Sequence, residues 1–174
     1  MALIAIVDHD NKVIGRKART AIKPGDIYTA STLWIKDGKG RVLLSQRSFR
    51  KENSPGKWGP SAAGTIEYDE SYVSNVIKEA KQELGITISP EQLQMGPLKF
   101  NQKTRTYFAQ SYIYTYEAKE DDFLLQNDEV VDVKWFDIAR VDDLLIKYPE
   151  MFSSSFADTW VLLKPFLFST PVSG

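Results

Sequence analysis

Short apolar runs separated by turn residues dominate the first third of the chain. Residues 3–7 and 13–17 are two such runs, and they flank the turn-forming tetrad Asp8–Asn11. Apolar runs of this length, rich in β-branched residues, are typical of strands, and a tight turn between two of them favours a hairpin. Residues 28–36 and 42–46 repeat the pattern. The chain is therefore expected to open with a hairpin and to continue with two further strands.

The spacing of apolar residues becomes helical between Gly64 and Ile86. Five apolar residues recur there every three or four positions: Val73, Val76, Ile77, Ala80 and Leu84. This spacing places them on one face of a helix, which is expected to pack against a core. Asp69 is predicted to cap the start of the helix, and Gly85 is predicted to end it in the left-handed conformation.

The second half of the chain returns to strand patterns and ends in helical ones. The predicted strands cover residues 86–88, 93–101, 104–117 and 130–136. Asp137 is predicted to cap a helix that runs to Tyr148. A last helix is expected over residues 153–168, started by a capping box at Ser155–Asp158 and kinked or ended by Pro165. Strands, one helix, more strands and two helices indicate an α+β domain with a mixed sheet between helices.

Length and composition fit one domain over residues 1–174, in which residues 1–27 form the N-terminal hairpin and loop. A hydrophobic content of 43% is enough for a core. The formal net charge of −1, without a block of Lys or Arg, argues against a nucleic-acid polymer as partner. The chain has no Cys, which excludes a disulfide framework and a cysteine nucleophile and is compatible with a cytoplasmic location. No segment approaches the length of a membrane span, so no membrane partner is expected.

Two acidic residues on the predicted helix are candidates for a metal site. Glu79 and Glu83 are four residues apart, so they are neighbours on one face, beside the apolar stripe. Gln82 follows three residues after Glu79 and can offer a carbonyl oxygen but no charge. Mg²⁺ or Mn²⁺ could bridge the two carboxylates and keep positions for water and phosphate oxygens. The alternative is that a helix face rich in Glu and Lys is simply solvated.

These glutamates belong to a longer pattern over residues 64–86. Its fixed positions are Gly64, Glu70, Lys78, Glu79, Ala80, Gln82, Glu83, Gly85 and Ile86. The pattern resembles the signature of the Nudix superfamily, G-x5-E-x7-R-E-U-x-E-E-x-G-U, where U is aliphatic. Lys78 stands where the family has Arg, and Gln82 stands where it has the first Glu of the Glu-Glu pair. The resemblance implies a Nudix-type α/β/α sandwich with a mixed β-sheet.

The same resemblance implies metal-dependent hydrolysis of a nucleoside diphosphate linked to another group. The implied ligands of Mg²⁺ or Mn²⁺ are Glu79, Glu83, the Gly64 carbonyl and, without charge, Gln82. Glu70 is expected to orient a neighbouring group. Lys78 is expected to pair with a carboxylate as the family's Arg does, but without the bidentate fork. The candidate general bases are Glu83 itself and Glu129, which lies in the loop before residue 130.

Outside the signature, residues 7–15, 42–58 and 127–141 are similar to the isopentenyl-diphosphate isomerase-like branch of the family. The cations that hold the diphosphate in that branch fall on Arg47, Lys51 and Lys17. The metal-binding His positions of the isomerases hold Tyr28 and Thr65, and the catalytic Cys position holds Ala63. Isomerisation is not expected, because the thiol that would protonate or deprotonate carbon and the imidazoles of the second metal site are missing.

Three functions remain open from the sequence. The first is a metal-dependent pyrophosphohydrolase that cleaves a diphosphate linkage in a small nucleoside diphosphate derivative. The second is a catalytically weak Nudix-fold module that binds a diphosphate ligand, and the third is a residual isomerase. A small-molecule diphosphate is the expected partner in each case. A homodimer is neither indicated nor excluded.

Overall fold

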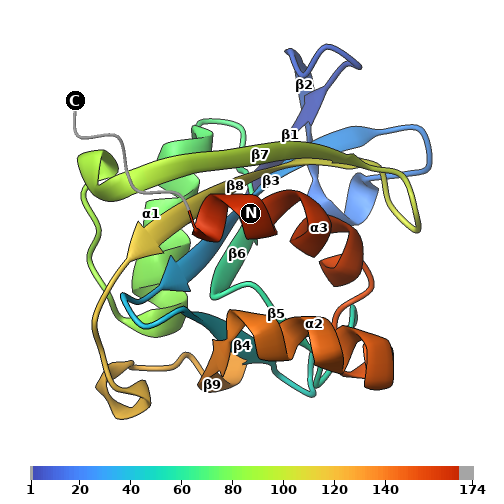
Figure 1. The fold of residues 1–174 in the computed structure, drawn as a ribbon. Helices are drawn as coiled ribbons and strands as arrows, with labels where there is room; N and C mark the ends of the chain where they lie inside the picture. The colour runs from blue at the N-terminus through green and yellow to red at the C-terminus, as the bar shows by residue number, and fades with distance from the viewer. Residues whose placement is uncertain (1, 169–174) are drawn as a thin grey trace.

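The computed structural model describes residues 2–168, which fold around one mixed sheet (Figure 1). Its strands are β1 (Leu3–Val7), β2 (Val13–Ala18), β3 (Ile27–Lys36), β4 (Arg41–Arg47), β5 (Trp58–Gly59), β6 (Ala62–Thr65), β7 (Leu93–Asn101), β8 (Tyr107–Thr115) and β9 (Val130–Asp137). The α-helices are α1 (Tyr72–Leu84), α2 (Ile138–Lys147) and α3 (Phe156–Leu167). Short 3₁₀ helices are η1 (Arg19–Ala21), η2 (Pro90–Gln92), η3 (Glu120–Asp122) and η4 (Pro149–Met151).

Strand β3 is the centre of the sheet. It pairs in parallel with β8 along one side, from Tyr28↔Tyr107 to Lys36↔Thr115. Its other side is shared by three antiparallel partners, which are β1, β6 and β4 in order along the strand. The predicted hairpin β1–β2 is confirmed, and it projects from the sheet at the upper right of Figure 1. Through this long parallel pairing β3 and β8, which are distant in sequence, form the central part of the sheet.

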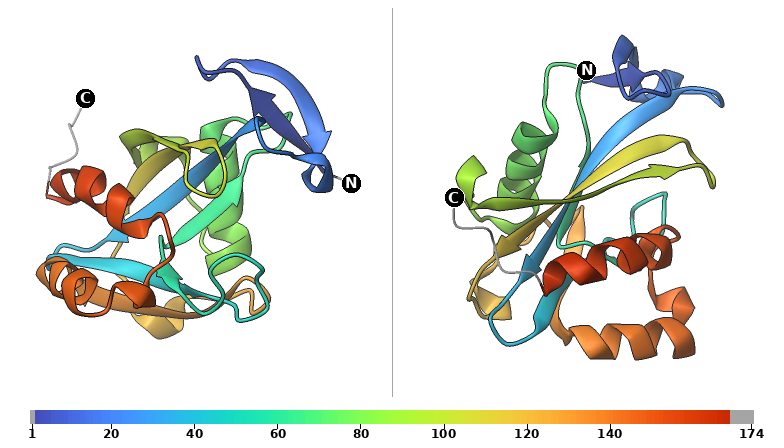
Figure 2. Two further views of the ribbon diagram at one scale, coloured as in Figure 1. Left: turned by 90° about the vertical axis from the view of Figure 1, so that its right-hand side faces the viewer. Right: turned by 45° about the horizontal axis from the view of Figure 1, so that its top comes forward.

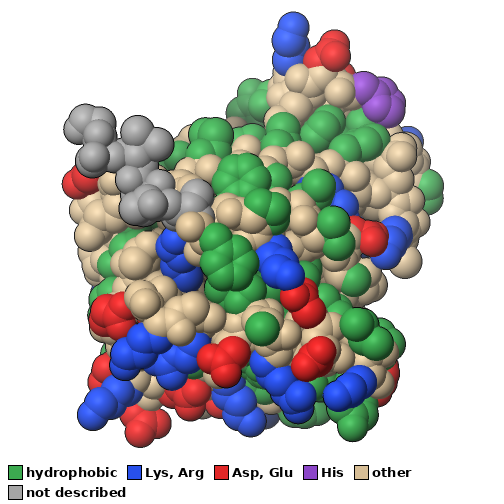
Figure 3. Space-filling model, in the orientation of Figure 1, with side chains coloured by type: hydrophobic (Ala, Val, Ile, Leu, Met, Phe, Trp, Pro, Cys, Tyr) green, Lys and Arg blue, Asp and Glu red, His purple; other side chains and the backbone are tan. Residues whose placement is uncertain are grey.

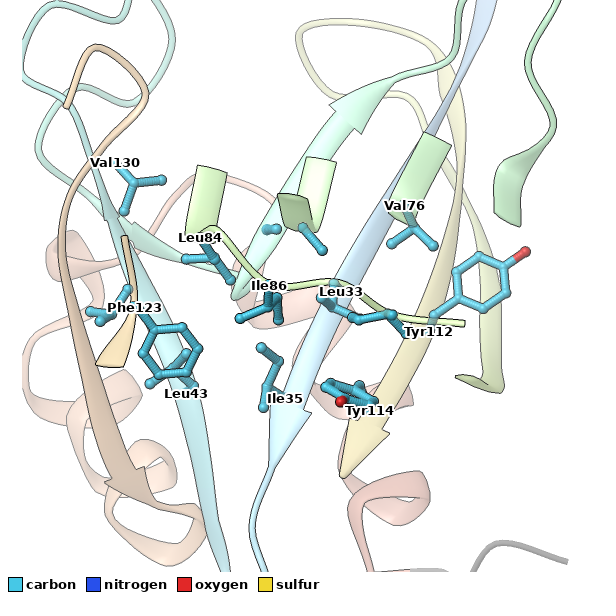
Figure 4. Close-up of a cluster of buried hydrophobic side chains, with 14 residues drawn as sticks. Leu33, Ile35, Leu43, Val76, Leu84, Ile86, Tyr112, Tyr114, Phe123 and Val130 are labelled. Atoms are coloured by element: carbon cyan, nitrogen blue, oxygen red, sulfur yellow. The ribbon is translucent and has the colours of Figure 1, made fainter. Parts of the chain in front are cut away.

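Helix α1 covers one face of the sheet, and α2 and α3 cover the other (Figures 1 and 2). Alternate residues of β3 point to opposite faces. Leu33 and Ile35 pack against Val76 and Leu84 of α1 in the cluster shown in Figure 4. Trp34 packs instead among the buried aromatic residues of α3. Burial of each large apolar side chain stabilises the fold by about 1.5–3 kcal/mol. The α+β prediction and the α/β/α sandwich are therefore confirmed.

The start of α1 differs from the prediction, and its end agrees. Ser71, not Asp69, is the N-cap residue: its hydroxyl accepts a hydrogen bond from the Ser74 N–H, and the Ser74 hydroxyl accepts one from the Ser71 N–H. Asp69 lies inside the preceding turn, which the Glu70 N–H closes onto the Glu67 carbonyl. Gly85 ends the helix with a φ of 72°, as predicted.

The predicted strand at residues 86–88 is wrong, because this segment pairs with no strand. Ile86 and Ile88 are buried against the α1 core, and the Ile86 N–H instead bonds to the Ala80 carbonyl at the end of the helix. The apolar residues of this segment did not distinguish a buried connection from a strand. Their side chains are buried in the core although the backbone forms no hydrogen bonds to a neighbouring strand.

The last helix, predicted over residues 153–168, is shorter than expected at its start. Ser155 takes the N-cap position without a side-chain hydrogen bond, so the predicted capping box does not form. Asp137 likewise precedes α2 without a side-chain cap. Pro165 lies inside the helix and does not end it, since the helix continues to Leu167. A proline so near the end removes only one hydrogen bond, and the buried Leu163 and Leu167 hold the last turn in place.

Charged side chains of both signs are distributed over the surface. On the face shown in Figure 3, basic and acidic side chains are intermixed along the lower half. His9, in the turn of the projecting hairpin, is exposed at the upper right, with its ring edge-on to Phe100. Within residues 2–168, no helix is both long and apolar enough to cross a membrane.

Candidate metal and diphosphate site

Strand β6 pairs with β3 along one edge, and the backbone groups of its other, unpaired edge face the site. The N–H of Ala63 donates a hydrogen bond of 3.0 Å to Oε2 of Glu83 from α1. The N–H of Ile66, three residues on, donates to Thr29 of β3. In an antiparallel strand the N–H and C=O of one residue point to the same side, and the side alternates along the chain. The carbonyl that faces the free edge beside Glu83 therefore belongs to Ala63, whereas that of Gly64 points to β3.

The Gly64 carbonyl was predicted to bind the metal, but Gly64 contributes to the site through its lack of a side chain. A Cβ atom built on Gly64 would lie 2.4 Å from both Cδ and Oε1 of Glu79. Contacts below about 3.0 Å do not occur at real Cβ atoms, so any side chain would displace the Glu79 carboxyl group. The absence of a side chain at Gly64 lets α1 approach β6 closely enough for Glu79 and Glu83 to reach its edge.

Both helix glutamates lie in an environment that resists their negative charge. Burial, together with the nearby carboxylates, raises the pKa of Glu83 to about 8. Burial also raises the pKa of Glu79 to about 7, against the opposing effect of Lys78. The Lys78 ammonium is 3.9 Å from Oε1 of Glu79, and a shorter contact holds it on Glu70. A buried acid and a partly buried one, without a close cation of their own, are suited to a dication.

The donor set fits a hard cation only if backbone and non-protein ligands complete it. Among residues 2–168, no group of three or more His, Cys, Asp or Glu side chains is arranged to hold a metal ion. Mg²⁺ is commonly bound through one or two carboxylates, with waters and substrate phosphates in the other positions. Glu79, Glu83 and the Ala63 carbonyl meet that description. Gln82, predicted as a further ligand, is exposed on the solvent side of α1.

Glu70 and Lys78 form a hydrogen-bonded network beside Glu79 and Glu83. Glu70 accepts hydrogen bonds from the Glu67 N–H at 3.0 Å and from Asn75 Nδ2 at 2.8 Å, and it pairs with Lys78. Burial would raise the pKa of Glu70, but these donors together lower it. Asn75 also donates to the Thr65 carbonyl at 3.2 Å and accepts from the Ser31 hydroxyl. The network thus ties the end of β6 to α1.

Sequence reasoning missed Asn75, which is fully buried in the helix. The one available signal was a short amide residue directly before Val76 in the apolar stripe. A buried amide has to find hydrogen-bond partners, so it commonly links two elements. Its partners lie on β3, on β6 and in the loop before α1, and no local pattern identified them.

The basic loop after β4 brings Glu129 to the site. Lys51 Nζ lies 2.6 Å from Oε2 of Glu129, and the Ser48 N–H bonds to the Glu129 carbonyl at 2.9 Å. Arg50 pairs in the same way with the neighbouring Asp128 at 2.8 Å. Glu129 contributes to the raised pKa of both Glu79 and Glu83, so its charge acts on both helix glutamates.

A small cavity of about 50 Å³ joins these parts. Its lining comprises Ser45, Arg47, Gly59, Pro60, Ser61, Ala62, Ala63, Glu83, Glu129, Val130 and Ser153. Arg47, predicted to bind diphosphate, therefore lies at the same cavity as Glu83 and Glu129. Lys17 does not join them, because it forms an ion pair of 2.7 Å with Asp26 beside the N-terminal hairpin. A larger hollow over α3 contains none of the predicted site residues.

An α/β/α sandwich whose helix glutamates reach over a signature glycine to a free strand edge defines a Nudix-type domain. The model of the NUDIX domain family matches residues 27–154, and the chain belongs to this family. An uncharacterised Nudix hydrolase of Yersinia pestis is 28% identical over 138 residues, which cover 76% of this chain and 71% of that protein. An isopentenyl-diphosphate Δ-isomerase of Serratia proteamaculans is 25% identical over 155 residues, covering 87% and 85%. The crystal structure of DR0079 from Deinococcus radiodurans shares the fold, with a TM-score of 0.76, 19% identity and coverage of 91% and 97%.

Proposed function

We propose that this protein is a metal-dependent pyrophosphohydrolase that cleaves the diphosphate linkage of a small nucleoside diphosphate derivative. The observation that carries the proposal is the position of the buried Glu83 and the partly buried Glu79 at the free edge of β6. Mg²⁺, or Mn²⁺ in its place, would be held by these carboxylates and the Ala63 carbonyl. It would supply positive charge against the charge of two phosphates.

The remaining residues bind and orient the substrate and handle the proton. Arg47, at the cavity, and Lys51, beside it, supply cationic groups to the phosphate oxygens. Oε2 of Glu129 is engaged by Lys51, which leaves Oε1 to accept the proton of the attacking water. Glu70 and Lys78 keep α1 in position relative to β6, so Glu79 and Glu83 are in place to bind the metal before the substrate binds.

Isomerisation is not proposed, although an isomerase is among the relatives. Ala63 stands at the position of the catalytic thiol, and its methyl group cannot exchange a proton with carbon. Thr65 and Tyr28 replace the imidazoles. The hydroxyl of Tyr28 has a raised pKa because of its burial, which disfavours proton release still further.

The proposal is tested by combining metal binding with a hydrolysis panel. Isothermal titration of the metal-free protein with Mg²⁺ should show binding that Glu83→Gln abolishes and that Glu91→Gln, at an exposed site on η2, leaves unchanged. Hydrolysis of nucleoside diphosphates, dinucleotides, nucleotide sugars and prenyl diphosphates would then be followed by chromatographic separation of the products, because cleavage inside a dinucleotide or nucleotide sugar gives two phosphomonoesters and no free phosphate. Turnover that needs Mg²⁺ and Glu83 supports the proposal. Binding of a diphosphate without turnover would favour the ligand-binding module instead.

A further inference from the structure

A second polar cluster lies at the other end of β6, on the sheet face opposite α1. Thr65 pairs with Ala30 of β3, and Tyr28 precedes Ala30 by two residues, so the Thr65 and Tyr28 side chains share this face. These are the two positions at which the isomerase branch has metal-binding histidines. Neither hydroxyl is a good ligand for a dication when neutral, so the chemistry of this cluster differs from that of a metal site.

Two arginines from separate connections converge on these hydroxyls. Arg19 of η1 donates from Nη1 to the Thr65 hydroxyl at 3.4 Å. Arg105 lies in the turn between β7 and β8, where the next residue, Thr106, accepts a hydrogen bond of 3.3 Å from the Tyr28 N–H on its carbonyl, and the charges of Arg105 and Arg19 oppose the rise in the Tyr28 pKa that burial causes. The η1 segment and the β7–β8 turn lie at the same end of the molecule, on the right in Figure 1.

The Tyr28 ring gives this cluster a rigid base. Its ring stacks on that of Tyr107 with a centroid distance of 5.1 Å and an interplanar angle of 16°. Tyr28 is 8% exposed and packs with Ile4 and Ile6 of β1. The hydroxyl is therefore fixed in position, whereas both arginines are exposed to solvent.

The charge of the two arginines is not balanced within the described part of the chain. The ion pairs of residues 2–168 include Lys17, Arg41, Arg50 and Lys51, but neither Arg19 nor Arg105. Two cations drawn to neighbouring hydroxyls repel each other unless an anion lies between them. Guanidinium groups supply the forked donors that a phosphate accepts, and the hydroxyls add neutral donors.

We propose that Arg19 and Arg105, with Thr65 and Tyr28, bind an additional phosphate group of the substrate, beyond the diphosphate that a dication on Glu79 and Glu83 would hold. Thr65 directly follows Gly64, so the two sites are adjacent along β6. The assignment of the second site to the substrate rests on the proposed function. The site would make the enzyme prefer diphosphates that carry a further phosphate over those that end in a neutral group.

Binding to inorganic polyphosphates tests this without requiring hydrolysis or knowledge of the base. Pyrophosphate and tripolyphosphate would be titrated in saturating Ca²⁺, a hard dication that the same oxygen ligands can bind, into the wild type, Arg19→Gln, Arg105→Gln and the double variant. Arg140→Gln, at an exposed arginine of α2, is the matched control. The wild type and the control should bind tripolyphosphate at least tenfold more tightly than pyrophosphate. The double variant should lose this preference and keep its pyrophosphate affinity within about twofold.

Two results would overturn the subsite. One is a double variant that keeps the wild-type preference, and the other is an equal loss of affinity for both ligands, which would mean a general effect of charge. Thermal melts of all variants establish that they are folded. Failure of the proposed function is separate, since it would appear as absence of Mg²⁺-dependent hydrolysis of every compound in the panel by the wild type while the binding preference persists.

Discussion

The burial of Glu83 predicts that the metal-free protein loses stability as the pH rises. Glu83 is 7% exposed, and its pKa is raised from 4.5 to about 8. In the window between these values the native state keeps a proton that the unfolded chain has released. The free energy of unfolding must then fall with rising pH. This contribution is fully present below pH 4.5 and is lost as the pH passes through about 8.

The size of the effect follows from the shift. One extra proton in the native state changes the free energy of unfolding by about 1.4 kcal/mol per pH unit, so Glu83 contributes at most about 5 kcal/mol over the window. Glu79, with its pKa raised to about 7, acts in the same direction. Acids whose pKa is lowered, such as Glu70, change their contribution below the window. The stability of the metal-free protein should therefore decline between pH 5 and pH 8.

Urea unfolding in EDTA at pH 5, 6, 7, 8 and 9 measures this decline directly. Glu83→Gln keeps the size of the side chain and a carbonyl oxygen for the Ala63 N–H, but it cannot ionise. Its stability should change less steeply with pH than that of the wild type, and the exposed-site control Glu91→Gln should follow the wild type. Saturating Mg²⁺ should restore wild-type stability at high pH, because the metal replaces the proton. A wild-type profile that is flat or rises in this window, or that Glu83→Gln reproduces, would refute the reasoning.

Three further substitutions test individual contacts. Gly64→Ala should weaken Mg²⁺ binding at least tenfold and lower the free energy of unfolding by about 1–3 kcal/mol, because its Cβ would displace the Glu79 carboxyl group. Gly15→Ala, where a Cβ meets no atom within 4 Å, is the control in both calorimetry and unfolding. Arg47→Ala should raise KM for a diphosphate substrate about tenfold with a smaller fall in kcat, and steady-state kinetics showing the reverse would contradict a ground-state contact. Gln82→Glu should change Mg²⁺ affinity less than about threefold, since this side chain is exposed, and a tenfold rise in titration calorimetry would show that it reaches the metal.

The sequence predicted the elements whose signals are local. The β1–β2 hairpin follows from its turn, and the end of α1 follows from Gly85, which has the left-handed φ that glycine adopts without strain. The start of α1 was placed two residues early, because Asp69 and Ser71 are both good N-cap residues and only the turn at Glu67–Glu70 decides between them.

Of the candidate site, the sequence predicted mainly the two glutamates that share one face of α1. The spacing of Glu79 and Glu83 places both at the edge of the buried stripe, and the structure brings both to β6. The partner strand and its register determine which carbonyl faces them, and this depends on pairing between β3 and β6. The Lys51–Glu129 pair joins residues 78 positions apart, so no local pattern could supply it.

The free edge of β6 has a consequence for how this family can diversify. At Ala63 the backbone N–H donates to Glu83, while the side chain points to the opposite face of the sheet from Gly64. Substitutions at positions 63 and 65 can therefore change the chemical groups on that face while the Ala63 N–H keeps its contact with Glu83. A thiol at position 63 could exchange a proton with carbon and an imidazole at position 65 could bind a metal, whereas the methyl group and the hydroxyl found here supply neither function. One four-residue strand can thus carry different side-chain chemistry on one face without disturbing the position of Glu83 at its edge.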